Sequence, residues 1–229
     1  TYVSGVAYWM GEGVFYSYDG RVNSLTCNLR RYIFTDINKE QVEQVFSGSN
    51  EQFHEIWWFY CSEGSTTVDS YVIYNYKEEI WYYGQMARTA WQDNTWSGQP
   101  LAATYNNRLV VHEIGVDDYE TGSAVAIPAF IESGQFDLED GDRFQLIQKI
   151  LPDVSFEGST AANPAVTMTL KPLSGSGSGY KATPSEGGTD TGDSTRTTTA
   201  PIEAYTDQLH VRVRGRQMVI RIDSADAGV

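Results

Sequence analysis

Short runs of aromatic and apolar residues alternate with polar turns in the first half of the chain, and these runs repeat. The runs AYWM at 7–10 and IWWFY at 56–60 each precede a Tyr-rich segment. The segment YSYDGRV at 16–22 aligns with YNYKEEI at 74–80. SYDGR and NYKEE suit tight turns between antiparallel strands. Each copy therefore predicts strand, loop, strand, turn and strand, which in the second copy are IWWFY, SYVIYNY and IWYYG.

A third stretch, PLAATYNNRLVVHEIG at 100–115, predicts two strands joined by Asn106-Asn107, because Asn tolerates positive φ.

Antiparallel units of three or four aromatic-rich strands, repeated every 50–58 residues or so, are typical of β-propeller blades. Two or three blades do not close a ring. We therefore expect residues outside this chain, N-terminal to it, to complete the propeller. A β-sandwich is the alternative architecture.

The segment between the two repeats is less regular. NKEQVEQVF at 38–46 predicts a short helix with Asn38 as its N-cap and Gln41 at the third helical position.

The pattern changes again from about residue 124. AVAIPAFIESGQFDL and RFQLIQKILPDVSF predict two strands around a charged hairpin turn at 139–142, and VTMTLKPL at 166–173 predicts a third.

Residues 174–200 form a Gly/Ser/Thr-rich arm without apolar anchors, a composition typical of a linker. We expect a neighbouring subunit or domain to order this arm, which would then act as an intersubunit clasp. The predicted organisation is thus an all-β chain with partial β-propeller blades at 1–120. A C-terminal antiparallel β-sheet or sandwich region at 121–229 carries the arm.

The end of the chain, QLHVRVRGRQMVIRID at 208–223, shows a break in its alternation. Leu209, Val211 and Val213 share one face of a strand, whereas the later apolar residues Met218, Ile220 and Ile222 fall on even positions. One unbroken strand cannot keep both sets on the same face. The sequence therefore predicts a bulge or tight turn at 214–216, where Gly215 would supply unusual backbone angles.

The charge of the chain argues against a nucleic-acid-binding protein of the usual kind. Thirty acidic residues against sixteen basic ones give a net charge of −14, which repels DNA at long range. A protein past which DNA slides without sticking remains compatible with this charge. Cys27 and Cys61 are too few and too dispersed for a disulfide scaffold or a zinc site. We interpret both as small core residues, with a disulfide between them as the alternative. No apolar run is long enough for a membrane helix. The chain begins at Thr1 and ends at AGV, which we interpret as cuts in a longer polypeptide.

The motifs of catalysis and cofactor binding are weak. His54 and His112 each precede a Glu but lack the spacing of a zinc-binding HExxH motif, so local hydrogen bonding is the simpler interpretation. The carboxylates of FDLEDGD at 136–142 lack the full arrangement of a calcium loop. SYDG at 17–20 does not continue as a sialidase Asp-box, and no nucleophile elbow is present. The sequence predicts neither an enzyme nor a cofactor.

Eight features in order along most of the chain carry a family resemblance: Asn50, EIWWFY at 55–60, YNY at 74–76, WYYG at 81–84, ARTAW at 87–91, HEIG at 112–115, IES…FDL…DGD at 131–142 and VRVRGRQM at 211–218. Together they resemble the tail nozzle (hub) proteins of short-tailed bacteriophages, known also as packaged-DNA stabilisation or tail accessory proteins. The resemblance implies a β-propeller-containing virion subunit, assembled in the host cytoplasm. It also implies a ring, commonly a homo-hexamer, that continues the DNA channel below the portal and adaptor.

The implied partners are further copies of the chain, the adaptor and portal-side proteins, tail fibre or needle proteins, and genomic DNA that passes without sequence-specific binding. No membrane partner is implied. A host-glycan-binding module or depolymerase at the tail tip is the alternative function, and a cellular propeller scaffold for peptides is a third. Within the basic C-terminal stretch, the residues predicted to face a neighbouring subunit or the channel lumen are Arg212, Arg214, Arg216 and Arg221.

Overall fold

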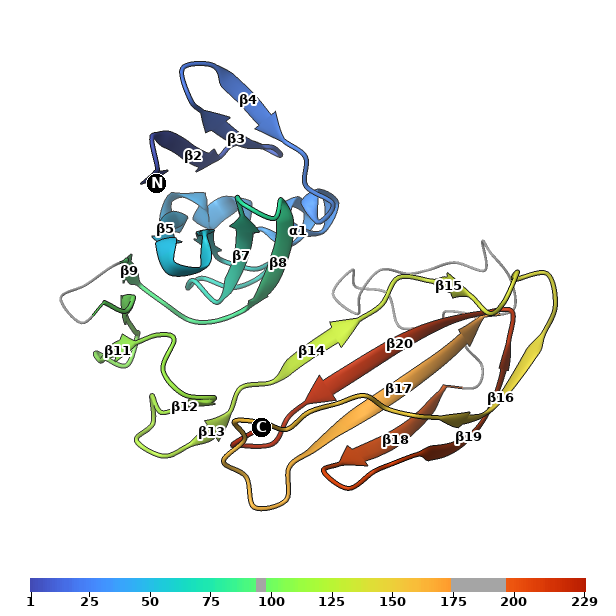
Figure 1. The fold of residues 1–229 in the computed structure, drawn as a ribbon. Coiled ribbons are helices and arrows are strands. Elements are labelled where there is room, and N and C mark those ends of the chain that lie inside the picture. Colours follow the sequence, from blue (N-terminus) through green and yellow to red (C-terminus); the bar gives the residue numbers. More distant parts are fainter. Residues whose placement is uncertain (94–97, 174–196) are drawn as a thin grey trace. The chain divides into compact units, whose positions relative to one another are not determined.

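The computed structural model of the chain describes residues 1–93, 98–173 and 197–229 (Figure 1). Strands hold 47% of these described residues and helices 8%, so the fold class is all-β, as predicted. It forms two compact units, Thr1–Ile114 and Gly115–Val229.

The described residues of the first unit form three antiparallel sheets. Two are four-stranded meanders with the orders β1-β2-β3-β4 and β5-β6-β7-β8, and the third has the order β11-β10-β9. The strands are β1 (Tyr2–Val3), β2 (Val6–Met10), β3 (Phe15–Tyr18), β4 (Val22–Leu25), β5 (Phe46–Asn50), β6 (Glu55–Tyr60), β7 (Ser70–Asn75), β8 (Ile80–Gln85), β9 (Ala90–Gln92), β10 (Leu101–Ala103) and β11 (Leu109–Val111).

The repeat predicted from the sequence is confirmed in these sheets. The first copy turns between β3 and β4, where Tyr18 pairs with Val22, and the second turns between β7 and β8, where Asn75 pairs with Ile80. The two copies therefore form equivalent meanders, although the second turn, at 76–79, is one residue longer than the first, at 19–21. The predicted Asn106-Asn107 turn also joins β10 to β11, and Asn107 adopts a φ of 56° there.

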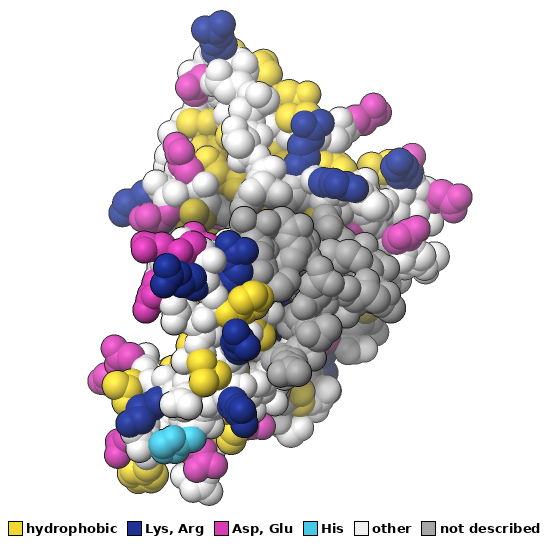
Figure 2. Space-filling model, turned by 90° about the vertical axis from the view of Figure 1, so that its right-hand side faces the viewer, with side chains coloured by type: hydrophobic (Ala, Val, Ile, Leu, Met, Phe, Trp, Pro, Cys, Tyr) yellow, Lys and Arg dark blue, Asp and Glu magenta, His cyan; other side chains and the backbone are white. Residues whose placement is uncertain are grey.

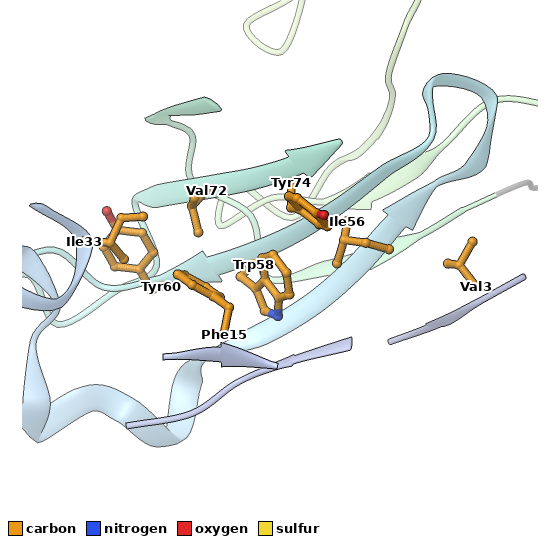
Figure 3. Packing of buried hydrophobic residues seen from close by; sticks show 8 residues of the cluster. All are labelled: Val3, Phe15, Ile33, Ile56, Trp58, Tyr60, Val72 and Tyr74. Atoms are coloured by element: carbon orange, nitrogen blue, oxygen red, sulfur yellow. The ribbon is translucent and has the colours of Figure 1, made fainter. Parts of the chain in front are cut away.

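The sheet β5–β8 is buried on both faces, because β6 is a nearly continuous apolar run. Ile56, Trp58 and Tyr60 point to one face and pack with Phe15 of the β1–β4 sheet (Figure 3). Trp57 and Phe59 point to the opposite face and pack with Trp91 of β9. Trp58 and Phe15 lie at 4.9 Å between ring centroids, and Trp57 and Trp91 at 5.0 Å. The first unit is thus a stack of three sheets, joined by aromatic contacts on both sides of the middle one.

Face-to-face stacking of antiparallel meanders is the packing of propeller blades. The described sheets form an open stack and do not close into a ring. Completion of a propeller therefore stays a prediction.

Two of the described helices of this unit lie between β4 and β5 in the sequence, and a third lies between β5 and β6. The predicted helix at 38–46 is present as a shorter 3-10 helix, η1 (Lys39–Gln44), and Asn38 is its N-cap, accepting a hydrogen bond from the backbone of Glu40. The sequence did not predict α1 (Arg30–Asp36), which buries Ile33, or η2 (Glu51–Phe53). A seven-residue helix with one fully buried side chain leaves too short an apolar periodicity to detect.

The second unit is a β-sandwich with a small two-stranded sheet added to it. One sheet has the order β14-β20-β17-β18, with β15 also pairing β20, and the facing sheet is the pair β16-β19. The separate pair is β12-β13. The strands are β12 (Asp117–Asp118), β13 (Val125–Ala126), β14 (Ala129–Glu132), β15 (Phe136–Asp137), β16 (Gln145–Ile150), β17 (Ala165–Leu173), β18 (Thr198–Glu203), β19 (Leu209–Gly215) and β20 (Gln217–Ser224).

A single core fills the space between the two sheets of the sandwich. Met168 and Leu170 of β17 and Met218 of β20 meet Val211 and Val213 of β19 there. All five side chains are buried.

Three predictions for this region are corrected. AVAIPAFIESGQFDL is not one strand but contributes β13, β14 and β15. The turn at 139–142 is not a hairpin turn, because β14 and β15 pair with β20 whereas β16 pairs with β19. That turn instead carries the chain from one sheet of the sandwich to the other. The predicted arm ends earlier than residue 200, since Thr198–Ala200 belong to β18, where β-branched Thr suits a strand. Residues 174–196 of the arm, and its proposed role as a clasp, lie outside the described residues.

The predicted break at 214–216 is confirmed, and it separates β19 from β20. Gly215 does not adopt a positive φ, so the predicted reason for the glycine is wrong. The reason is space: a Cβ on Gly215 would lie 2.8 Å from the Gln217 carbonyl oxygen and 3.0 Å from Pro172. The chain crosses between the two sheets at this corner, and only a residue without a side chain fits.

Candidate functional site

The corner at Gly215 distributes the four candidate arginines over opposite sides of the sandwich. Arg212 and Arg214 lie on β19, with their side chains on the outer face of the β16-β19 sheet. Arg221 lies on β20, on the outer face of the other sheet. Arg216 lies at the corner itself, where its Nε donates a hydrogen bond to the Gly141 carbonyl at 2.9 Å. The four arginines therefore do not form one site.

The outer face of β16-β19 gathers basic side chains, and we call it the basic face. Arg214 pairs with Leu146 across the two strands, and His210 pairs with Lys149. All four of these side chains and that of Arg212 are exposed. Neither strand contains an acidic residue. Figure 2 looks at the side on which β16 and β19 lie in Figure 1, and shows Lys and Arg interspersed with hydrophobic side chains, with Asp and Glu toward the left and lower edges.

A β-bulge shapes the basic face. The register of β16 against β19 shifts between Ile147 and Lys149, so Ile147 and Ile150 both point into the core although they are three residues apart. The bulge places Gln148 and Lys149 side by side on the outer face. Simple alternation along RFQLIQKIL does not predict this arrangement.

The two arginines of the basic face have few intramolecular partners. The guanidinium carbon of Arg214 lies 5.2 Å from the centroid of the Phe144 ring, a cation–π contact. Neither arginine forms an ion pair with any residue in the described ranges.

Arg221, in contrast, is fully engaged within the chain. It forms a bidentate pair with Asp223, with a shortest distance of 2.6 Å, and its Nη1 lies 3.5 Å from Glu132. Glu132 also accepts from Lys171 at 3.0 Å, and the Phe130 ring lies 3.9 Å from the guanidinium carbon. The hydrogen bond to Asp223 raises the pKa of Arg221 above its ordinary value. This cluster stabilises the outer face of its own sheet, and leaves Arg221 little capacity for a partner.

The three-sheet stack ends in two apolar faces, one on each outer sheet. These faces were not predicted from the sequence. The first open face lies on the β1–β4 sheet and consists of Tyr2, Trp9, Tyr16, Tyr18 and Val22. The second open face lies on the β9–β11 sheet and consists of Leu101, Leu109 and Val111. Tyr2 is 70% exposed and Leu109 is 71% exposed, and the rings of Trp9 and Tyr16 stack at 5.3 Å. Both faces point away from the central sheet, because the alternate residues of the same strands pack against it.

A third feature is a polar cluster located where β5 ends and β6 begins. The amide nitrogen of the fully buried Asn50 donates to Glu113 at 3.1 Å, whereas its amide oxygen has no protein partner in the described part of the chain. Trp57 donates to Glu55 at 3.0 Å. Burial raises the pKa of both carboxyl groups, and the proximity of Glu113 adds to the shift of Glu55. A cavity of about 270 Å³ adjoins Asn50 and is lined also by Glu51, Gln52, Asp93, Gly98 and Pro100.

The other chemical motifs are engaged locally. His54 contacts the Tyr76 hydroxyl at 3.3 Å, and His112 accepts from Arg88 at 3.1 Å, which confirms the interpretation of both as locally bonded residues. In FDLEDGD, Asp137 accepts from Gln217 and Glu139 from Gln145. No three His, Cys, Asp or Glu side chains in the described ranges are grouped closely enough to bind a metal ion. Cys27 and Cys61 are free and lie in or against the core, as predicted, and burial raises the pKa of Cys27 to about 11.

Comparison with known proteins adds no identification: no family model matches the chain, and no curated protein matches it either. Among the described residues, no helix has the length and apolar character needed to span a membrane.

Proposed function

We propose that this chain is part of a structural subunit of a bacteriophage tail, a nozzle or hub protein whose copies form a ring around the DNA channel. The observation that carries the proposal is the open stack of three aromatic sheets in the first unit. The eight sequence features that resemble the nozzle family support it independently.

The open stack supports further blades at both of its ends. The middle sheet is covered on both faces by aromatic contacts, and this is how a blade inside a propeller is buried. The two outer sheets are also antiparallel, four-stranded in β1–β4 and three-stranded in β9–β11, but their outward apolar faces remain exposed. Contiguous exposed apolar surface of this kind marks an interaction site. We infer that neighbouring blades, formed by residues outside this chain, cover the first and second open faces.

The charge of the chain suits a conduit. A net charge of −14 disfavours persistent contact with DNA phosphates, each of which would add a salt-dependent attraction. DNA could then pass the ring without being held by it. In this proposal the ring meets the adaptor and portal on one side and tail fibre or needle proteins on the other. No chemical step is assigned to the chain.

The experiment that tests this function is a cryo-electron microscopy map of the intact tail and of the purified full-length protein with its portal and adaptor. We expect a ring of this subunit on the channel axis, with a further antiparallel sheet packed on each open face. If Trp9 and Leu109 face solvent in that map, the propeller interpretation is wrong. Absence of the subunit from the wall of the channel would contradict the conduit.

The first open face also favours a second candidate, a glycan-binding tail component. The stacked rings of Trp9 and Tyr16, with the exposed Tyr18 beside them, form an aromatic platform on which a sugar ring could lie. A glycan array, together with an assay for released reducing sugar, separates binding from cleavage. Trp9→Ala should abolish glycan binding if this face is the site, whereas Tyr205→Ala, at an exposed tyrosine of the second unit, should not.

A further inference from the structure

The cations of the basic face have no carboxylate partner among the described residues, although the same unit supplies such partners elsewhere. On the outer face of the other sheet, Arg221 and Lys171 are matched by Glu132 and Asp223. On the basic face, Arg212 and Lys149 have neither an ion pair nor a hydrogen bond to a described side chain. The two strands of the basic face contain only positive charges, whereas the whole chain has a net charge of −14. This contrast within the described part of the unit favours another molecule as the source of carboxylates for the basic face.

The side chains between the cations indicate a protein as that molecule. Leu146 lies beside Arg214 and is 49% exposed, and Phe144 is exposed to the same degree. Leu151, which follows β16, is 71% exposed. Arginine and aromatic side chains together are typical of protein interfaces, which combine an apolar centre with polar groups. A track for phosphates gains nothing from exposed leucines, and it would have to overcome the negative charge of the whole chain.

We propose that the basic face binds a carboxylate-bearing surface of a second copy of this chain. This inference rests on the ring of the proposed function and names one of its contacts. Without Lys149, Arg212 and Arg214, the chain has thirteen basic residues against thirty acidic ones, so almost any other surface of a neighbouring copy offers carboxylates. Charge complementarity of this kind fixes which surfaces meet and suppresses wrong pairings.

The contact must join two different surfaces. If two basic faces met each other about a two-fold axis, Arg212 and Arg214 would approach their own equivalents, and like charges would repel. A contact between unlike surfaces is heterologous, and such contacts generate closed rings when the rotation between copies closes. The basic face therefore fits a head-to-tail ring contact better than a symmetric dimer.

The test compares two charge reversals in the full chain. Arg212→Glu with Arg214→Glu reverses the basic face, and Arg21→Glu with Lys77→Glu reverses two exposed basic residues in turns of the first unit. Both variants change the net charge equally. Circular dichroism and thermal melting confirm that each variant folds. Sedimentation velocity then measures association at ~50 mM and ~500 mM NaCl, where screening differs strongly.

We expect the wild-type chain to associate at low salt and to dissociate at high salt. The Arg212 and Arg214 reversal should weaken association about tenfold or more, and the control reversal should not. Equal association of all three proteins, or a wild-type chain that stays monomeric at both salt concentrations, would overturn the inference.

Two further results separate this inference from other readings. A fluorescence anisotropy titration with duplex DNA measures binding to phosphates. If DNA binds the wild type and the control but not the Arg212 and Arg214 reversal, the basic face binds nucleic acid, and the proposal is overturned. A tail ring that assembles normally from the reversed protein would also overturn the contact, while leaving the proposed function intact. Salt-sensitive association of copies, together with a tail map that lacks the ring, would support the contact and contradict the function.

Discussion

The indole ring of Trp91 lies directly on Gly48, across the interface between the β9–β11 sheet and the central sheet. A Cβ atom on Gly48 would overlap the ring. The indole nitrogen donates to the Ser49 carbonyl at 2.8 Å, and the ring stacks on Trp57. The absence of a side chain at residue 48 therefore allows two neighbouring sheets to pack.

The first prediction concerns this contact. Gly48→Ala should destabilise the first unit by about 1–3 kcal/mol, because the extra methyl group overpacks the interface and displaces Trp91. Denaturant unfolding followed by far-UV circular dichroism, which reports on both units, measures the change. Gly134→Ala is the control, since a Cβ there meets nothing within 4 Å. Equal effects of the two substitutions would show that the Trp91 contact does not hold the sheets together.

Much of the first unit could be predicted from the sequence, because its signals are local. The run EIWWFY is apolar at every position from Ile56 to Tyr60, and a strand of this kind is buried on both faces. The turns at 19–21 and 76–79 contain Asp, Gly, Lys and Glu, so they separate the strands clearly. The open faces could not be predicted, because alternation within a strand does not tell which face a neighbouring sheet covers.

The second unit could be predicted less well, because its pairings are not local. The strands β14 and β16 are close in sequence, yet each pairs with a strand near the C-terminus. The parity change around Gly215 gave the position of the corner but not its consequence. Because of the corner, Arg212 and Arg221 lie on opposite sides of the sandwich, although they belong to one basic stretch of the sequence.

The second prediction concerns the corner itself. Gly215→Ala should cost about 1–3 kcal/mol, because the added Cβ would lie 2.8 Å from the Gln217 carbonyl and 3.2 Å from that of Leu173. Backbone atoms cannot move aside as a flexible side chain would. Hydrogen exchange measured by mass spectrometry should show faster exchange in β19 and β20. Unchanged exchange there would contradict the close packing of the corner.

The third prediction concerns the cluster around Arg221. Arg221→Met should destabilise the second unit by about 1–2 kcal/mol, since Asp223 loses its bidentate partner in a half-buried setting. Glu132 retains Lys171, which limits the loss. Arg212→Met on the exposed basic face should change stability by less than about 0.5 kcal/mol. Chemical denaturation of both variants tests the difference, and a larger effect at Arg212 would reverse the assignment of these two arginines.

The fourth prediction concerns the open faces. Leu109→Thr with Val111→Thr should leave the stability of the isolated chain nearly unchanged, because both side chains are already exposed. The same pair should impair incorporation of the full-length protein into tails, if a further blade packs there. Thermal melting and quantification of tail-bound protein give the two readouts. Normal incorporation would show that this face stays uncovered.

The last prediction concerns pH and rests on Glu55. Burial raises its pKa above the ordinary value of 4.5, and Glu113 raises it further, although the hydrogen bond from Trp57 opposes the shift. The folded chain thus holds this proton more tightly than the unfolded chain. The contribution of Glu55 to the free energy of unfolding is therefore most favourable below pH 4.5. It is lost as the pH rises from 4.5 through the pKa of the folded state.

Glu55→Gln should remove this dependence while keeping an acceptor for the Trp57 indole. The variant should match the wild type near pH 4, where the carboxyl group is largely protonated in both states, and exceed it in stability at pH 7. Glu12→Gln, at an exposed carboxylate, removes the same charge and serves as the control. Urea unfolding at both pH values measures the differences. If Glu55→Gln loses stability at pH 7 relative to the control, the ionised carboxylate is favourable where it lies, and burial does not dominate at this site.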